Sequence, residues 1–156
     1  MRLEKNFTID EVYNWINRLG YNDETKNWLI KMCKDDIESN PDRLLFIKSI
    51  ATELQRIRDF VNQQFPEFGG KLTVNITSWL RPIEWEKFRR RSGNSRHTNG
   101  DAVDFIIGGA GGKTNEIMHW LFRYLNNWNG GLAAFVRNGM YSFIHIDLGR
   151  KRRWYY

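Results

Sequence analysis

Residues 69–78 read GGKLTVNITS, and the pattern of the chain changes within this stretch. From Leu72 onward apolar and polar residues alternate, so that Leu72, Val74 and Ile76 would share one face and the polar residues the other. Alternation with a period of two is typical of a strand with one buried face. The two glycines end the pattern that precedes them. We therefore expect a sheet to begin here and to occupy the second half of the chain.

The residues before this stretch predict helices. Thr8 can cap a first helix, because Glu11 three residues later completes a capping box. A second helix is expected to follow, and Pro41 suits the first turn of a third and longest one. In that helix apolar residues recur every three or four positions as far as Pro66. We expect residues 1–68 to form a helical N-terminal portion.

The residues after this stretch continue the sheet. Alternation, short apolar runs and glycine-containing turns predict further strands at 102–107, 132–136 and 141–148 and a helix at 115–128. No internal repeat, low-complexity tract or linker divides the sequence. We expect a single domain spanning 1–156, in which the helical portion packs on a small, mainly antiparallel sheet formed by 71–154. The predicted fold class is α+β.

Size and composition indicate one globular domain. The chain has 156 residues, of which 41% are hydrophobic and 15% aromatic. This is enough for one apolar core of ordinary size, and it excludes a disordered chain. No run approaches the roughly 20 apolar residues of a membrane-spanning helix, and the N-terminus lacks the apolar core of a signal peptide. We expect a protein that is made in the cytoplasm and has no transmembrane segment.

Cys33 is the single cysteine of the sequence. One cysteine excludes an internal disulfide and a zinc site built from several thiolates. Any bound metal would therefore be held by histidine and carboxylate side chains. Cys33 itself lies in a helix-like stretch, which favours a buried, inert thiol over a nucleophile.

The positive charge of the chain predicts attraction to polyanions. The formal net charge is +6, and basic residues are densest at 89–91 and at 150–153, where Trp154, Tyr155 and Tyr156 follow. The partner could be nucleic acid, anionic lipid or the phosphate-bearing polymers of a bacterial envelope. Solvated surface is the plainer interpretation of both runs. Because aromatic and cationic side chains together bind single strands, a nucleic-acid-binding module is one alternative function.

Asp104 interrupts the apolar run AVDFII at 102–107. An unpaired carboxylate in a buried strand is costly to desolvate, so a positive group should face it. A metal ion, an arginine or a lysine would each serve. From this strand alone, a structural ion pair is the favoured interpretation.

Two histidines can complete a metal site around this carboxylate. His145 and Asp147 lie two residues apart in a predicted strand, so their side chains point the same way. His97 precedes Asp104 in a loop with Gly100, which permits the sharp turn that would bring the two together. Each of these histidines, taken alone, is more typical of an ordinary polar residue than of a metal ligand. Two histidines and one carboxylate that converge, however, match an open catalytic zinc site, which keeps a fourth position for water.

The sequence also resembles a known family in three ordered blocks. The segment SRHTNGDAVD at 95–104 is similar to the Ser-x-His-x-x-Gly-x-Ala-x-Asp signature of D-alanyl-D-alanine carboxypeptidase-type zinc peptidases, with all five fixed positions matched. Upstream, ITSWLRP at 76–82 resembles the Ser-x-x-Arg strand end of that family. Downstream, FIHIDLG at 143–149 resembles its last metal strand. The resemblance covers about 71–154, and the residues near the N-terminus resemble the opening of small phage members.

This resemblance implies a fold, a metal and an activity. The fold would be that of the hedgehog and D-Ala-D-Ala peptidase proteins, with His97, Asp104 and His145 as zinc ligands. Zinc-bound water would be the nucleophile, and Arg81 would steady the substrate carbonyl. The expected enzyme is a zinc metallopeptidase that hydrolyses peptidoglycan stem peptides, as a D-Ala-D-Ala carboxypeptidase or an endolysin-type endopeptidase.

The resemblance also implies where such an enzyme acts. It would work as a monomer on the bacterial cell wall, and the phage-like opening suggests that it is encoded by a phage and made in the host cytoplasm. The anionic wall surface, rather than a specific nucleic acid, would be the partner of the positive charge.

One position departs from the family pattern. Many members carry an acid as general base three residues before the last metal histidine, and here that residue is Ser142, which cannot take a proton from zinc-bound water at neutral pH. Asp147 is the nearest acidic substitute, or else a group that orients a metal ligand. Glu84 and Asp101 are further candidates, while His119 is expected to be structural.

The missing acid leaves a second alternative function open. A zinc domain of the same fold that has lost catalysis and only binds the cell wall or a partner would need no general base. Cleavage assays separate that alternative from an active enzyme. The other alternative function, a nucleic-acid-binding module, does not explain the carboxylate of Asp104.

Overall fold

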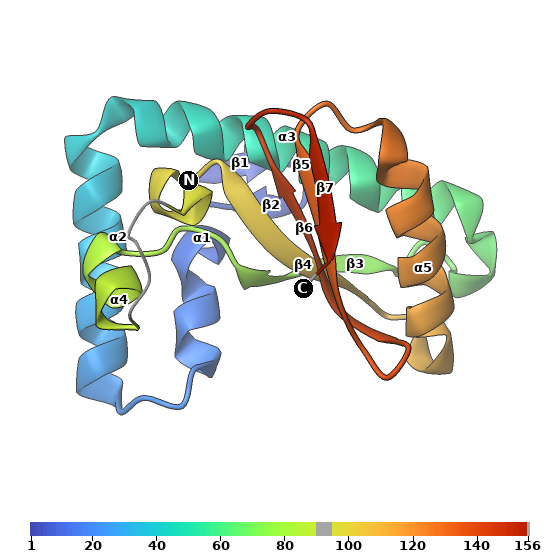
Figure 1. Cartoon of the computed structure of the whole chain (residues 1–156), viewed down its shortest axis with the longest axis horizontal. Coiled ribbons are helices and arrows are strands. Elements are labelled where there is room, and N and C mark those ends of the chain that lie inside the picture. Colours follow the sequence, from blue (N-terminus) through green and yellow to red (C-terminus); the bar gives the residue numbers. More distant parts are fainter. Residues whose placement is uncertain (90–94, 156) are drawn as a thin grey trace.

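The computed structural model describes residues 1–89 and 95–155, and its architecture is α+β as predicted (Figure 1). The basic run predicted at 89–91 lies only partly in this range, because Arg90 and Arg91 are outside the described residues. The same holds for Tyr156 at the aromatic end of the chain.

The N-terminal portion is helical apart from a short antiparallel hairpin that the sequence pattern did not predict. The hairpin consists of β1 (Arg2–Glu4) and β2 (Phe7–Thr8). The helical elements are α1 (Glu11–Asn14), a 3-10 turn (Trp15–Arg18), α2 (Asp23–Ser39), α3 (Pro41–Gln64) and a second 3-10 turn (Pro66–Phe68). The prediction that Thr8 caps the first helix is wrong, because Thr8 lies in β2 and Asp10 occupies the N-cap position of α1. Only the contact with Glu11 is present, since the backbone N–H of Thr8 donates to Glu11 Oε2 at 2.9 Å.

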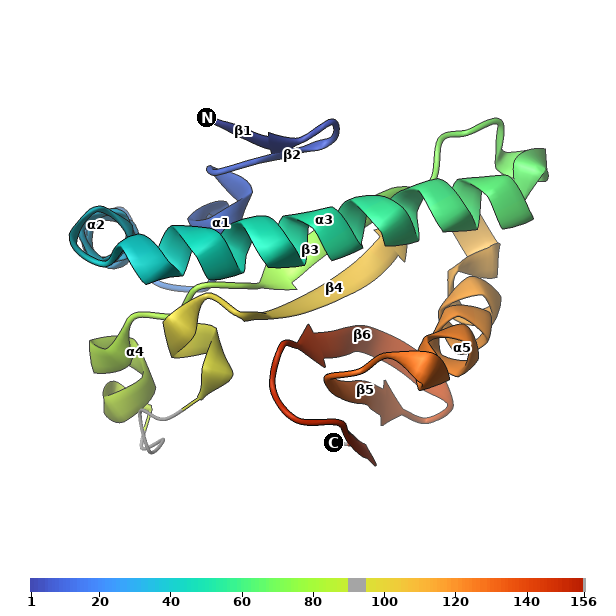
Figure 2. The same ribbon diagram turned by 90° about the horizontal axis from the view of Figure 1, so that it is seen from above.

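The longest helix, α3, follows the predicted pattern. It begins at Pro41 and ends two residues before Pro66. Its buried side chains recur every three or four residues, among them Ile47, Ile50 and Leu54. Figure 2 shows α3 running alongside β3 and β4. The buried face of α3 and the sheet belong to one continuous hydrophobic core, which explains why an amphipathic helix of this length is stable here.

The second portion of the chain forms a five-stranded sheet. Its strands are β3 (Thr73–Ser78), β4 (Ala102–Gly108), β5 (Gly131–Arg137), β6 (Met140–Asp147) and β7 (Arg152–Tyr155). They are arranged in the order β3-β4-β6-β5-β7. Three neighbouring pairs are antiparallel, and only β5 and β7 are parallel. The prediction of a mainly antiparallel sheet is confirmed.

Short helices connect these strands. They are α4 (Ile83–Phe88), a 3-10 turn (Arg96–Asn99), another (Gly111–Lys113), α5 (Thr114–Tyr124) and a last 3-10 turn (Leu125–Asn127). The last two elements correspond to the helix predicted at 115–128. The sequence pattern did not predict α4 or the strand β7. None of the helices in the described parts of the chain is long and apolar enough to cross a membrane.

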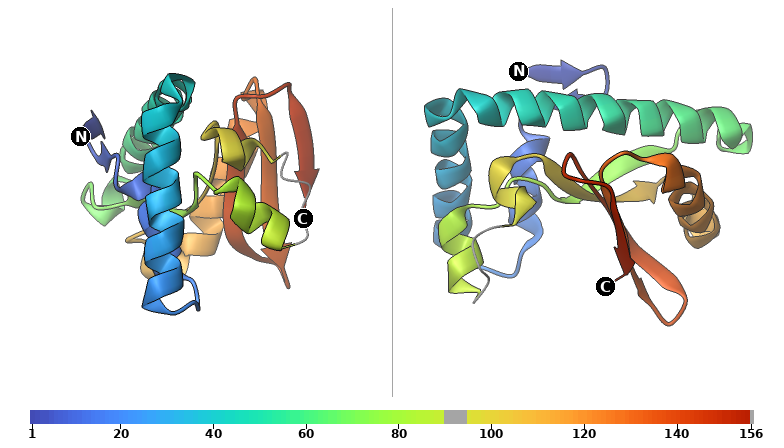
Figure 3. Two further views of the ribbon diagram at one scale, coloured as in Figure 1. Left: turned by 90° about the vertical axis from the view of Figure 1, so that its left-hand side faces the viewer. Right: turned by 45° about the horizontal axis from the view of Figure 1, so that its top comes forward.

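The two faces of the sheet differ in character. On β6, Ile144 and Ile146 point into the hydrophobic core, whereas the alternate residues His145 and Asp147 point to the other face. Figure 3 shows α2 and α3 on one side of the molecule and β5, β6 and β7 on the other. The face that carries His145 is therefore the one on which the predicted metal ligands should be sought.

Candidate metal centre

Asp104 and His145 lie directly opposite each other on neighbouring strands. The register of β4 and β6 pairs the two residues, and both side chains are almost completely buried. Side chains on directly opposed residues of antiparallel strands are close enough to interact. His145 Nδ1 is 2.8 Å from Asp104 Oδ1.

His97 reaches the same carboxylate from the 3-10 turn before β4. Ser95 Oγ accepts a hydrogen bond from the backbone N–H of His97 at the start of the turn (3.2 Å), and Gly100 ends it with a φ of 80°. A side chain at Gly100 would be strained in this left-handed conformation and would also meet Ile47 Cγ1 at 3.1 Å. The loop thus turns as sharply as predicted, and His97 Nε2 lies 3.4 Å from Asp104 Oδ1.

Backbone contacts fix the orientation of the His97 ring. Its Nδ1 is 2.8 Å from the carbonyl oxygen of Trp79, which can only accept, so Nδ1 carries the hydrogen. The carbonyl oxygen of His97 in turn accepts from the backbone N–H of Arg81. The unprotonated Nε2 is left facing the cluster. It is buried and makes no hydrogen bond to any described residue.

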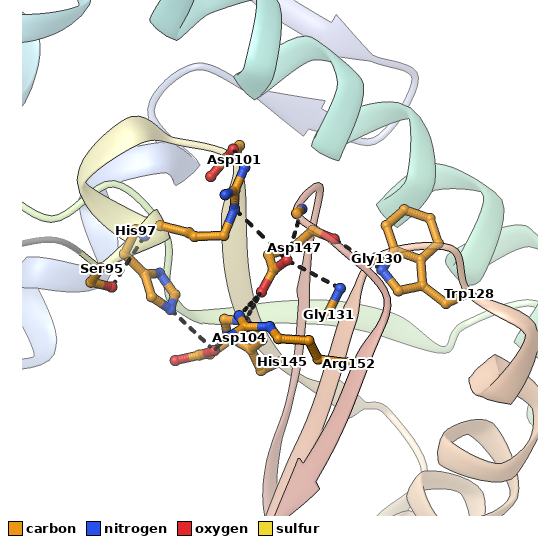
Figure 4. Close-up of polar contacts among 12 residues, drawn as sticks. Ser95, His97, Asp101, Asp104, Trp128, Gly130, Gly131, His145, Asp147 and Arg152 are labelled. Atoms are coloured by element: carbon orange, nitrogen blue, oxygen red, sulfur yellow. Dashed lines mark hydrogen bonds and ion pairs between the residues drawn. The ribbon is translucent and has the colours of Figure 1, made fainter.

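The three side chains form a group that could hold a metal ion. One nitrogen of each histidine and one oxygen of Asp104 all lie within 4.8 Å of one another, and all three residues are buried (Figure 4). We refer to His97, Asp104 and His145 as the His-Asp-His cluster. A buried imidazole nitrogen with a lone pair and no donor is costly unless something occupies the space in front of it. A cation in the cluster would remove this cost.

The protonation equilibria in the cluster are strongly shifted. Burial lowers the pKa of His97, and the neighbouring Asp104 only partly offsets this effect. Burial alone would raise the pKa of Asp104, but the two histidines outweigh it and hold the pKa well below its usual range. Burial would likewise lower the pKa of His145, but hydrogen bonds to Asp104 and Asp147 raise it instead. The cluster thus keeps a buried anion that requires a positive partner.

Arg81 supplies a second positive partner for Asp104. Its guanidinium donates to Asp104 Oδ2 at 3.2 Å, to Glu86 Oε1 at 3.3 Å and to Ser78 Oγ at 2.8 Å. Glu86 is completely buried in α4. Asp104 therefore uses one oxygen for the cluster and the other for an ion pair with Arg81, which confirms the structural ion pair predicted for this residue. The contacts with Glu86 and Ser78 hold Arg81 beside the cluster.

Asp147 supports His145 on the other edge of its ring. Asp147 Oδ2 is 2.8 Å from His145 Nε2, while His145 Nδ1 faces Asp104. Oδ1 of Asp147 accepts from the backbone N–H groups of Gly131 (3.1 Å) and Gly149 (2.8 Å), and Arg152 lies 3.3 Å from Oδ2. Although burial would raise the pKa of Asp147, these hydrogen bonds lower it to about 2. Asp147 is thus a fixed anion on the side of His145 that faces away from the cluster.

The close approach of Asp147 depends on a glycine in the neighbouring strand. Gly131 lies opposite Asp147 in the register of β5 and β6. A Cβ atom at this position would lie 2.3 Å from Asp147 Oδ2, far inside van der Waals contact. The absence of a side chain at Gly131 makes room for the carboxylate.

The other candidates from the sequence lie away from the cluster. Ser142 is exposed and forms a bulge in β6, where two residues of β6 oppose one of β5. Glu84 is exposed and lines a hollow between α2 and α4. Asp101 is buried and paired with Arg96. His119 lies on α5, with Nδ1 3.0 Å from the hydroxyl of Tyr141.

Cys33 has the environment expected of a structural thiol. Its side chain is buried and its sulfur lies 3.6 Å from the carbonyl oxygen of Leu80. Burial raises the pKa of the Cys33 thiol well above its usual range. A thiol in this environment stays protonated and unreactive.

An open cleft of about 330 Å³ adjoins the cluster. Arg81 and Asp104 lie in its wall, together with four aromatic side chains, Trp15, Trp85, Phe135 and Phe143. The ring of Trp85 has the guanidinium carbons of Arg81 and Arg89 at 5.8 and 4.9 Å from its centre. The sequence pattern did not predict this aromatic wall, in which Phe143 alternates with His145 along β6.

Comparisons of this chain with models of known protein families, with curated proteins and with solved structures found no match.

Proposed function

We propose that the chain is a zinc metallopeptidase of the D-alanyl-D-alanine carboxypeptidase type, which hydrolyses peptide bonds in peptidoglycan stem peptides. One observation carries this proposal. Three residues picked out by the sequence motif, His97, Asp104 and His145, come from separate segments and offer ligand atoms within 4.8 Å of one another. The similarity of 95–104 to the signature of that peptidase family supplies the link to the reaction.

The donor set favours zinc over harder cations. Two imidazole nitrogens and one carboxylate oxygen suit zinc, whereas calcium and magnesium prefer oxygen ligands. His97 Nε2, His145 Nδ1 and the carboxylate of Asp104 would hold the ion. The buried Nε2 of His97, which has no hydrogen-bond partner among the described residues, supports this fit. Three protein ligands are also the number found in catalytic zinc sites, which keep one position open.

When bound, zinc would supply a Lewis acid for the scissile carbonyl and would bring the pKa of a coordinated water towards neutrality. The residues of this chain would do the rest. Arg81 is always protonated and lines the cleft, so its guanidinium can stabilise negative charge on the carbonyl oxygen of a substrate. Glu86 and Ser78 hold Arg81 in this position. The aromatic wall of the cleft would exclude water from the substrate.

Asp147 would act through His145. Its carboxylate accepts from the ring edge opposite the proposed ligand atom, which fixes the tautomer and the orientation of the imidazole. This contact favours the supporting role over that of general base, because the carboxylate lies behind the ring rather than in front of it. The proton acceptor of the reaction would then have to come from another group.

A second candidate function follows from the same observation. Ser142 stands where many family members carry the general base, and none of the other acids considered, Glu84 and Asp101, lines the cleft. A zinc domain that binds cell-wall peptides without cleaving them would need no base. The two candidates share the metal and differ only in turnover.

The decisive experiment measures zinc and cleavage on the same protein samples. Zinc per chain is determined by elemental analysis, and peptidoglycan fragments incubated with the zinc-loaded protein are analysed by mass spectrometry. We expect about one zinc per chain and new peptide termini in the fragments. His97→Ala and His145→Ala should lose both. His119→Ala, a histidine outside the cluster, is the matched control for metal binding and should keep its zinc.

Each outcome discriminates between the candidates. Zinc without new termini would favour the binding domain over the enzyme. Full zinc retention in both cluster variants would contradict the metal site, and with it the proposed activity.

A further inference from the structure

A groove of about 460 Å³ lies between α5 and the last strand, β7. Its volume falls in the range of about 300 to 1,000 Å³ typical of small-ligand sites. One wall is a single face of α5, because His119, Phe122 and Arg123 follow one another at helical spacing and Asn126 continues the row. The other wall comes from β6 and β7.

The lining of this groove shares no residue with the His-Asp-His cluster. In the strand register, Arg153 of β7 lies opposite Leu132 of β5, and Leu132 lies opposite Ile146 of β6. Ile146 points into the hydrophobic core. The alternate positions on these strands, Ala133 and His145, point to the opposite face. Most of the groove therefore opens on the face of the sheet that does not carry the His-Asp-His cluster. Trp154 also lines the groove but lies on the cluster side, where its ring centre is 5.2 Å from that of His145.

Aromatic side chains form the floor of the groove. Phe122 lies between Tyr141 and Tyr155, with ring centres 6.1 and 5.4 Å away. The ring of Phe122 is tilted by 56° to that of Tyr141 and by 58° to that of Tyr155, so it forms a parallel slot for a flat base with neither of them. Tyr155 is 68% exposed and offers its ring to a ligand. Aromatic faces of this kind carry partial negative charge and attract the C–H groups of a saturated ring.

The polar groups of the groove are cationic or neutral, and one is an available cation. No aspartate or glutamate is among the described residues that line it. Arg153 is committed to the fold, because its guanidinium donates to the backbone carbonyls of Asn126, Trp128 and Gly130. Arg123 is exposed and has no acidic partner among the described residues. His119 engages Tyr141 through Nδ1, which leaves Nε2 for a ligand.

We propose that this groove binds a sugar that carries one free carboxylate, such as the lactyl-bearing amino sugar of a bacterial glycan strand whose stem peptide has been removed. The saturated ring packs on the aromatic floor, the carboxylate pairs with Arg123, and the hydroxyl and amide groups bond to His119 and Asn126. This is a binding site additional to the proposed peptidase centre. It does not require the metal.

The same features disfavour a nucleic acid as the ligand. Single-stranded nucleic acids need a track of cations along the phosphates and open ring faces for successive bases. Here the guanidinium of Arg123 has no acidic partner among the described residues, and that of Arg153 is tied to three backbone carbonyls. A single available cation matches a single carboxylate.

The test compares two sugars that differ in one group. N-acetylmuramic acid and N-acetylglucosamine share the same ring and acetamido group, but only the first carries a lactyl carboxylate. Each is titrated into the full-length protein and followed by NMR chemical shifts, and peptide-free glycan oligosaccharides and oligothymidylate are titrated in parallel. We expect N-acetylmuramic acid to bind about ten-fold or more tightly than N-acetylglucosamine, as a charge-assisted hydrogen bond predicts.

Variants locate the site and separate it from the metal centre. Arg123→Gln should abolish the preference for the carboxylated sugar, and Arg123→Lys should retain part of it. Tyr155→Ala should weaken both sugars, whereas Arg56→Gln, the same change at an exposed arginine of α3, should alter neither. Removing zinc with a chelator should leave the affinities unchanged, so this proposal can hold even if the peptidase proposal fails.

Several results would overturn the proposal. They are the absence of sugar binding, equal binding of the two sugars by the unaltered protein, and a preference that survives in Arg123→Gln. Tighter binding of oligothymidylate that depends on Arg123 would assign the groove to nucleic acid instead.

Discussion

Asp147 touches the edge of His145 that faces away from Asp104, so its removal should act first on metal affinity. We expect Asp147→Asn to keep the fold while weakening zinc binding by about 10- to 100-fold, because the anion that orients the imidazole is lost. Competition with a chelating dye measures the affinity, and circular dichroism checks the fold. Glu84→Gln, at an exposed acid outside the cleft, should behave like the unaltered protein.

A different result would change the role of Asp147. Unchanged zinc affinity with turnover lowered by about 10² to 10⁴ would identify it as the general base. If neither quantity changed, both roles would be refuted.

Ser142 allows the opposite test, in which an acid is added rather than removed. It is the extra residue of the bulge in β6, and bulges redirect a side chain relative to regular alternation. If the redirected side chain faces the cleft, Ser142→Glu should raise the rate of peptide cleavage by about 10² or more, since a positioned base is worth that much. Ser142→Gln has the same shape without a basic carboxylate and should not raise it. Equal rates in the two variants would show that position 142 does not serve the reaction.

The three residues of the cluster could be predicted from the sequence, but their surroundings could not. His97, Asp104 and His145 stand out because a motif and an anomalous acid in an apolar strand mark them. Trp15 follows the spacing of an ordinary helix, and Trp85 lies in a helix too short to give a period. Which of such residues line a cleft depends on how distant elements pack, and that information is not local.

At the scale of elements, the site depends on the fit between β5 and β6. Gly131→Ala would place a Cβ 2.3 Å from Asp147 Oδ2, so the carboxylate or the strand must move. We expect a loss of about 1 to 3 kcal/mol in the free energy of unfolding, as for other overpacked sites, together with weaker zinc binding. Chemical denaturation and zinc titration measure the two effects. Gly20→Ala, where a Cβ meets nothing within 4 Å, should show neither effect.

The accuracy of the predicted elements follows their length and periodicity. The helix between Pro41 and Pro66 was predicted almost to the residue, because two prolines bound a long apolar repeat. The strands β3, β4, β5 and β6 were recognised from their alternation or their short apolar runs. The hairpin at the N-terminus and β7 were missed, since each has at most four residues. Strand β7 pairs in parallel with β5, a contact that sequence neighbours do not determine.

At the scale of the whole molecule, metal binding should stabilise the fold. The proposed ligands come from a turn, from the strand that follows it and from a strand much later in the sequence, so a metal ion would bind the folded state and not the unfolded chain. At a zinc concentration about 100 times the dissociation constant this adds about 2.7 kcal/mol, or roughly 5 to 10 °C in melting temperature. Calorimetry with and without zinc measures the shift, and His97→Ala should abolish it.

The stabilisation by zinc should also depend on pH. Imidazoles bind metal only when neutral, and the pKa of His145 is raised above its ordinary value by Asp104 and Asp147 despite burial. Protons therefore compete with zinc as the pH falls through that raised pKa, and the zinc-dependent shift in melting temperature should shrink towards acid pH. A shift that stayed constant down to pH 5 would contradict histidine ligation.

The basic run at 150–153 extends into β7, which lies at an edge of the sheet, and this position gives its charges a second role. β7 is an edge of the five-stranded sheet, and its exposed backbone could template the addition of a strand from another molecule. Its short length and the charges of Arg152 and Arg153 oppose such edge-to-edge aggregation. Substitutions that remove these charges to reduce non-specific adhesion would therefore also remove the residues that oppose edge-to-edge pairing. The chain would then become prone to self-assembly through this edge.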